Sequence, residues 1–143
     1  MSGNRFTISF LRSTLELFGV VFLRFRPIQR AWGVWLVAVN AAAIAFIGHI
    51  EAQVTLAAVG VAVLGQALIY QRKRFIRLLG TTHIFWVPMI AWIATRLDTL
   101  PEGESALRIW LITLIVTNAT SLVIDALDAA RFLRGERQPH YAW

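Results

Sequence analysis

Four long apolar stretches, separated by short polar connections, constrain the fold of this chain more than any other feature. A helix needs about 20 apolar residues to cross the hydrocarbon core of a bilayer. In lipid such stretches must be helical, because a helix satisfies its backbone hydrogen bonds internally. The four predicted spans cover residues 31–50, 54–70, 78–94 and 107–125.

The composition supports a membrane-embedded chain. Hydrophobic residues make up 57% of the 143 residues and charged residues only 15%, with a mean hydropathy of +0.62. Soluble domains carry about a quarter charged residues. The absence of cysteine excludes disulfides, thiolate metal sites and cysteine nucleophiles. The sequence therefore predicts an all-α integral membrane protein with one four-helix transmembrane domain, residues 27–130.

The segments on either side of this domain are expected to be peripheral. In residues 1–26 the apolar run from Leu17 to Leu23 is too short to span a bilayer, and polar residues recur at helical spacing. This pattern predicts an amphipathic helix in the headgroup plane. A helix packed against the outside of the bundle is the alternative. Residues 131–143 are predicted to form a basic tail.

The distribution of cations predicts the orientation of the spans. Twelve of the fourteen Lys and Arg residues fall in the N-terminal segment, the connection between the second and third spans, and the tail. By the positive-inside rule, both termini should be cytoplasmic, in a bacterial-type inner membrane. The net charge of +6 then reflects basic residues that contact anionic lipid headgroups, and no nucleic-acid partner is expected.

Polar residues interrupt the apolar spans at comparable predicted depths. On the fourth span, Asn118, Ser121, Asp125 and Asp128 share an arc of roughly 100°. Hydrocarbon cannot form hydrogen bonds with these side chains, so this face of the helix must face protein or water. Together with the polar residues of the other spans, this arc predicts a polar pocket in the cytoplasmic half of the membrane. No comparable group of polar residues is predicted in the outer half. The candidate pocket residues are Asn40, Gln66, His83, Asn118, Ser121 and Asp125.

Two interpretations of these polar residues remain open. In the first, His83 and Asp125 form a titrating pair in a site that faces the cytoplasm. In the second, the same groups are interhelical hydrogen bonds that hold the bundle together. Asp128 is expected to have a structural role, while Asp125 fits either interpretation. The residues predicted to form structural ion pairs or to contact lipid headgroups are Asp128, Arg72, Lys73, Arg74, Arg77 and Arg131.

Neither a cofactor nor an enzyme activity is predicted. His49, His83 and His140 lie at different depths, which argues against a bis-histidine haem. Metal-binding and nucleophile motifs such as HExxH and GxSxG are absent from the sequence. His49 and Glu51 are expected in an exposed hairpin rather than in a metal site.

The sequence leaves two functions of different class. The first is a non-catalytic subunit or scaffold, as a homo-oligomer or in a larger membrane complex. The alternative is a small channel or transporter that uses the polar pocket. The small-residue pairs Ala38/Ala42 and Ala41/Ala45 of the first span and Ala58/Ala62 of the second are predicted to pack these two spans on each other. A kink is expected near Pro88.

Overall fold

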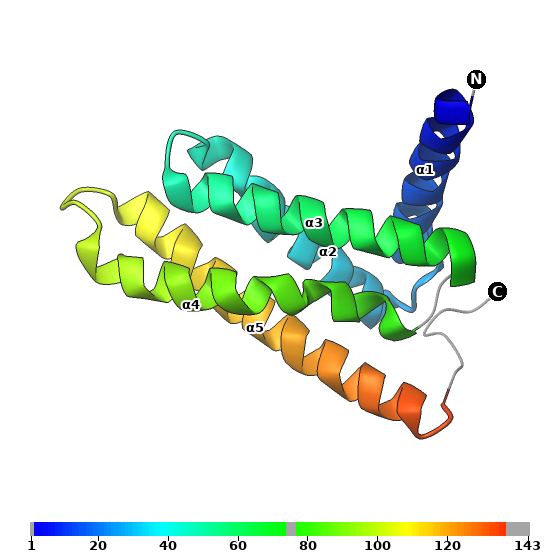
Figure 1. The fold of residues 1–143 in the computed structure, drawn as a ribbon. Helices are drawn as coiled ribbons and strands as arrows, with labels where there is room; N and C mark the ends of the chain where they lie inside the picture. The colour runs from blue at the N-terminus through cyan, green and yellow to red at the C-terminus, as the bar shows by residue number, and fades with distance from the viewer. Residues whose placement is uncertain (1, 74–76, 137–143) are drawn as a thin grey trace.

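The computed structural model describes the backbone of residues 2–73 and 77–136, and the side chains of residues 8–73 and 77–136. These residues are helical, without a strand (Figure 1). Four helices are long and apolar enough to cross a membrane, which confirms the predicted helical class and the number of candidate spans. They cover Pro27–Phe46, Ile50–Lys73, Arg77–Thr99 and Ser105–Leu133.

The four long helices run up and down beside one another. The first combines α2 (Pro27–Ala41) with a 3₁₀ turn, η2 (Ala42–Phe46); the second is α3 (Ile50–Lys73). The third combines η3 (Arg77–Phe85), α4 (Trp86–Arg96) and η4 (Leu97–Thr99), and the fourth is α5 (Ser105–Leu133). Helices α2 and α4 each pack on both α3 and α5, so they occupy diagonal positions. We call the end that carries Pro27, Lys73 and Leu133 the α1 end, and the opposite end the hairpin end (Figure 1).

The first hairpin turns earlier than the sequence predicts. Helix η2 ends at Phe46, and the backbone N–H of His49 bonds to the Phe46 carbonyl. The Gln53 amide then donates to the Ile47 carbonyl and closes the turn. Helix α3 therefore begins at Ile50, and Glu51 lies in its first turn. The expectation that Glu51 belongs to an exposed hairpin is wrong, because this residue is only 2% exposed.

The N-terminal helix α1 (Ser2–Gly19) crosses the α1 end of the bundle (Figure 1). A single π turn, η1 (Val20–Arg24), connects it to α2. Leu17 packs with Tyr70 and Leu79 in a small buried cluster, so α1 is attached to α3 and η3. A second apolar face of α1 is left exposed, and it carries Ile8, Leu11 and Leu15.

The third span changes its helix type along its length. Residues Arg77–Phe85 form an unusually long 3₁₀ segment, and an α-helix begins at Trp86. Pro88 lies in the first turn of α4, where its missing N–H has no partner to lose. Thr81 and Thr82 donate hydroxyl bonds to carbonyls three residues earlier, which supports the tighter winding. The helix type thus changes shortly before Pro88, and the kink predicted at this proline stays a prediction.

The hydrophobic core is concentrated in the half of the bundle nearer the hairpins. Leu107, Leu111 and Leu114 of α5 are at most 1% exposed and pack with Ile93 of α4. The Trp110 indole N–H donates to the Val39 carbonyl and ties α5 to α2. This half of the bundle is therefore densely filled by side chains.

The small-residue faces of the first two spans pack on each other only in part. Ala42 of η2 and Ala58 of α3 are partly buried against the core cluster that contains Ala62, and η2 packs on α3. Ala38, Ala41 and Ala45 are exposed instead. Ala38 and Ala45 therefore leave an outward face of the first span free of packing within the described chain.

Candidate functional site

A cavity of about 810 Å³ lies inside the α1-end half of the bundle. It is lined by residues of α1, η1, α2, α3, η3, α4 and α5, most of them aliphatic or aromatic. A smaller set of polar residues also lines it, and this set contains most of the sequence-predicted pocket. These polar residues are Gln29, Asn40, Gln66, Arg77, His83, Ser121, Asp125, Asp128 and Arg131.

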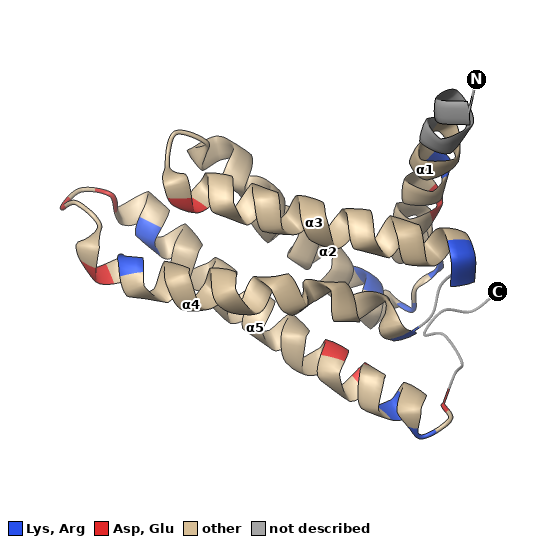
Figure 2. Cartoon of the chain, in the orientation of Figure 1, with Lys and Arg blue, Asp and Glu red and all other residues tan. Residues whose placement is uncertain are grey.

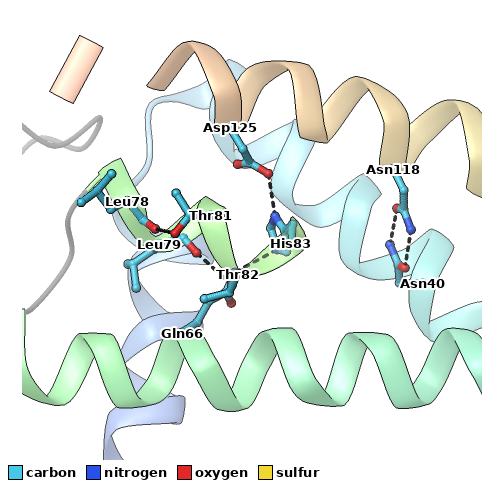
Figure 3. Close-up of polar contacts among 9 residues, drawn as sticks. All are labelled: Asn40, Gln66, Leu78, Leu79, Thr81, Thr82, His83, Asn118 and Asp125. Carbon is cyan, nitrogen blue, oxygen red and sulfur yellow. Dashed lines mark hydrogen bonds and ion pairs between the residues drawn. The ribbon is translucent and has the colours of Figure 1, made fainter. Parts of the chain in front are cut away.

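His83 forms the centre of a three-residue hydrogen-bond chain that joins three helices (Figure 3). Its Nδ1 lies 2.7 Å from Asp125 Oδ2 on α5, and its Nε2 lies 2.9 Å from Gln66 Nε2 on α3. The amide N–H of Gln66 is a donor, so the imidazole accepts at Nε2 and donates Nδ1–H to Asp125. This arrangement holds the imidazole ring between α3 and α5.

The Gln66 side chain carries both an amide N–H and an amide oxygen, so it can pair with His83 Nε2 whether that nitrogen accepts or donates. On the other side of the ring, the contact with Asp125 joins η3 to α5. A hydrogen-bonded His–Asp pair that connects two helices beside a cavity is the main chemical feature of the site.

Gly80 allows η3 to approach α5 closely enough for this contact. A Cβ atom at position 80 would collide with the carboxylate of Asp125. Only a residue without a side chain lets the two helices meet here, one turn before His83. Gly80 was not among the sequence-predicted site residues.

The remaining members of the predicted pocket divide into a pair and a single residue. Asn40 and Asn118 exchange two amide hydrogen bonds, at 2.9 and 3.0 Å, and join α2 to α5 (Figure 3). Ser121 is 3% exposed and lines the cavity, and its hydroxyl has no hydrogen-bond partner among the described residues. The structure thus joins His83, Gln66 and Asp125 in one chain and places the asparagine pair apart from it.

The predicted ion pairs at the α1 end form only in part. Arg77 Nη1 lies 2.9 Å from Asp128 Oδ1, and both side chains are largely buried. Arg131 lies 4.0 Å from the same carboxylate. Arg72 and Lys73 are exposed at the end of α3 and pair with no described residue. Arg74 and the tail from residue 137 onward lie outside the described residues.

A buried ion pair at the hairpin end was missed from the sequence. Arg96 Nε lies 2.5 Å from Glu51 Oε1, and the glutamate side chain is 3% exposed. The guanidinium of Arg96 also lies over the Trp92 ring, 5.3 Å from its centroid. The prediction that only the other half of the bundle carries interior polar groups is therefore wrong. In the sequence, the only sign of this pair is the position of Glu51 directly before an apolar span. The same position also fits an acidic residue at an exposed helix N-terminus.

Trp86 is a second residue that the sequence did not identify. Its ring stacks on His83 with a centroid distance of 3.9 Å, and it lines the cavity. Its indole N–H is buried without an acceptor in the described part of the chain. A buried donor without a partner is uncommon in native structures and calls for an explanation.

The described residues hold no group of three or more His, Asp or Glu side chains able to bind a metal ion. The site thus consists of an apolar cavity, one hydrogen-bonded His–Asp–Gln chain, and a buried ion pair at the α1 end. No protein-family model, curated protein or solved structure matches this chain.

Proposed function

We propose that this chain is a multi-pass protein of a bacterial-type inner membrane, with both termini in the cytoplasm. The cations support this orientation, because among the described residues they gather at the α1 end (Figure 2). The hairpin end carries Arg96 and Arg108 together with four acidic residues. The exposed Ile8, Leu11 and Leu15 of α1 would dip into the lipid boundary beside anionic headgroups.

Within that membrane, we propose a non-catalytic role as a subunit or scaffold of a larger assembly. The observation that carries this proposal is the exposed small-residue face of the first span. Ala38 of α2 and Ala45 of η2 lie about two helical turns apart and contact no other long helix closely enough to be buried. In membranes, faces of this kind allow two helices to approach closely and gain van der Waals contact. A helix of a second chain, identical or different, is the expected occupant.

Site-specific photocrosslinking in intact membranes tests this role. A benzophenone amino acid at Ala38 should give discrete protein adducts of defined mass, because the α2 face would contact a partner helix. The matched control position is Val87, which is 48% exposed on α4, diagonally across the bundle. Adducts of equal yield and pattern from both positions, or lipid adducts alone from Ala38, would contradict the proposal.

Transport is the second candidate, and the His83–Asp125 contact beside an open cavity favours it. A titratable pair in such a position is typical of proton-coupled carriers. Against it stands the tightly filled half of the bundle, where Leu107, Leu111 and Leu114 leave no polar path. We therefore regard the subunit role as better supported.

Flux measurements on the purified chain in liposomes discriminate the two candidates. We expect no proton or small-cation flux above that of empty liposomes, at a protein density where a control channel leaks. His83→Ala and Asp125→Asn should then behave like the wild type. A wild-type flux that both substitutions lower at least tenfold would overturn this expectation and favour transport.

A further inference from the structure

We propose that the cavity binds a lipid-soluble molecule with a neutral, carbonyl-bearing head, the chemical class of the isoprenoid quinones. This inference rests on the proposed membrane location and is independent of the subunit role. The cavity volume of about 810 Å³ lies in the range of small-molecule binding sites, which are mostly apolar with a few well-placed polar groups. The aliphatic and aromatic walls suit a hydrocarbon tail.

The unpartnered hydroxyl of the cavity indicates the chemistry of the head. Ser121 lines the cavity, and its hydroxyl has no hydrogen-bond partner among the described residues. A donor that exchanges water for a ligand without gaining an acceptor is unfavourable, so the complementary group is an oxygen acceptor such as a carbonyl.

The charges around the cavity favour a neutral head over an anionic one. The lining contains two arginines, Arg77 and Arg131, and two acids, Asp125 and Asp128. Asp128 lies near both arginines, and Asp125 is held by His83. A phosphate or carboxylate head would meet these acids without a surplus of cations to neutralise it.

Aromatic residues and the position of the opening complete the argument. Trp86 stacked on His83, with Trp32 on α2, gives the cavity flat surfaces for a planar ring. Its rim includes Ile28 of α2, 83% exposed, and Leu127 of α5, 56% exposed. Because these rim residues are apolar and lie on α2 and α5, the cavity opens toward lipid rather than water. A molecule dissolved in the bilayer can reach it sideways.

The test is binding of decylubiquinone to the purified full-length chain in phosphatidylcholine nanodiscs, measured by native mass spectrometry. Saturable one-to-one binding is expected for the wild type. Val63→Phe should weaken it at least tenfold by filling the lined space, whereas Leu64→Phe, on the adjacent exposed position, should leave it unchanged. Ser121→Ala should weaken binding several-fold through loss of the donor, and Trp86→Phe should weaken it through loss of aromatic surface on the cavity wall.

The other outcomes would overturn the proposal. Equal binding to wild type and to both Val63→Phe and Trp86→Phe would mean that the probe does not occupy the cavity. Preferential binding of palmitate over decylubiquinone would refute the neutral head. Ser121→Ala removes only a hydroxyl group, so it remains informative if Val63→Phe fails to fold. A failure to bind would leave the crosslinking result at Ala38 unaffected, so the two proposals can fail separately.

Discussion

Gly80→Ala is expected to lower the free energy of unfolding by about 1–3 kcal/mol, the usual cost of overfilling a packed interior. The reason is steric, because the new methyl group would occupy the position of the Asp125 carboxylate. To relieve the collision, either the Asp125 carboxylate must rotate away or η3 must move away from α5, and in both cases the 2.7 Å contact between His83 and Asp125 is lost or lengthened. Denaturation in mild detergent, with the His83 ring ¹⁵N shifts as a local probe, measures both effects.

Gly60→Ala is the matched control for this prediction. A Cβ atom at Gly60 meets nothing within 4 Å, and the residue lies in the interior of α3. Alanine is the better helix former by roughly 0.5–1 kcal/mol, so this variant should be as stable as the wild type or slightly more stable. In addition, Asp125→Ala should partly rescue Gly80→Ala, since it removes the carboxylate that causes most of the clash. Equal stability of the Gly80 and Gly60 variants would contradict the steric argument.

Helical periodicity and span counting predicted the arrangement of the polar pocket to a useful extent. Gln66, His83 and Asp125 lie on three different spans, and counting residues from the span ends gives them a common depth. The structure joins these three side chains in one hydrogen-bonded chain. Depth along a helix follows from the sequence alone because each residue adds a fixed rise of about 1.5 Å.

Other features depend on which neighbour a helix face meets, and periodicity does not encode this. The alanines of the first span were expected to face α3, but only part of them do, and Asn40 of α2 bonds instead to Asn118 of α5. The close approach at Gly80 also depends on the 3₁₀ winding of η3.

The buried pair at the hairpin end illustrates the same limit and leads to the second large effect. Arg96→Met should destabilise the bundle by about 3–5 kcal/mol, because it leaves the charge of Glu51 buried without a partner. Glu51→Gln should cost less, since its amide oxygen can still accept from Arg96 and no charge is left in the interior. Thermal and chemical denaturation of the two variants in the same detergent measure this asymmetry.

The double variant distinguishes a charge effect from a loss of packing. If the cost of Arg96→Met comes from the unpaired carboxylate, Glu51→Met combined with Arg96→Met should recover most of the lost stability, because an apolar pair replaces the ion pair. Glu102→Gln, at an exposed acid of the second hairpin, should change stability by less than about 0.5 kcal/mol. A double variant as unstable as Arg96→Met would instead assign the effect to the arginine stem that packs over Trp92. The Glu51–Arg96 contact would then be a consequence of that packing rather than a cause of the hairpin's stability.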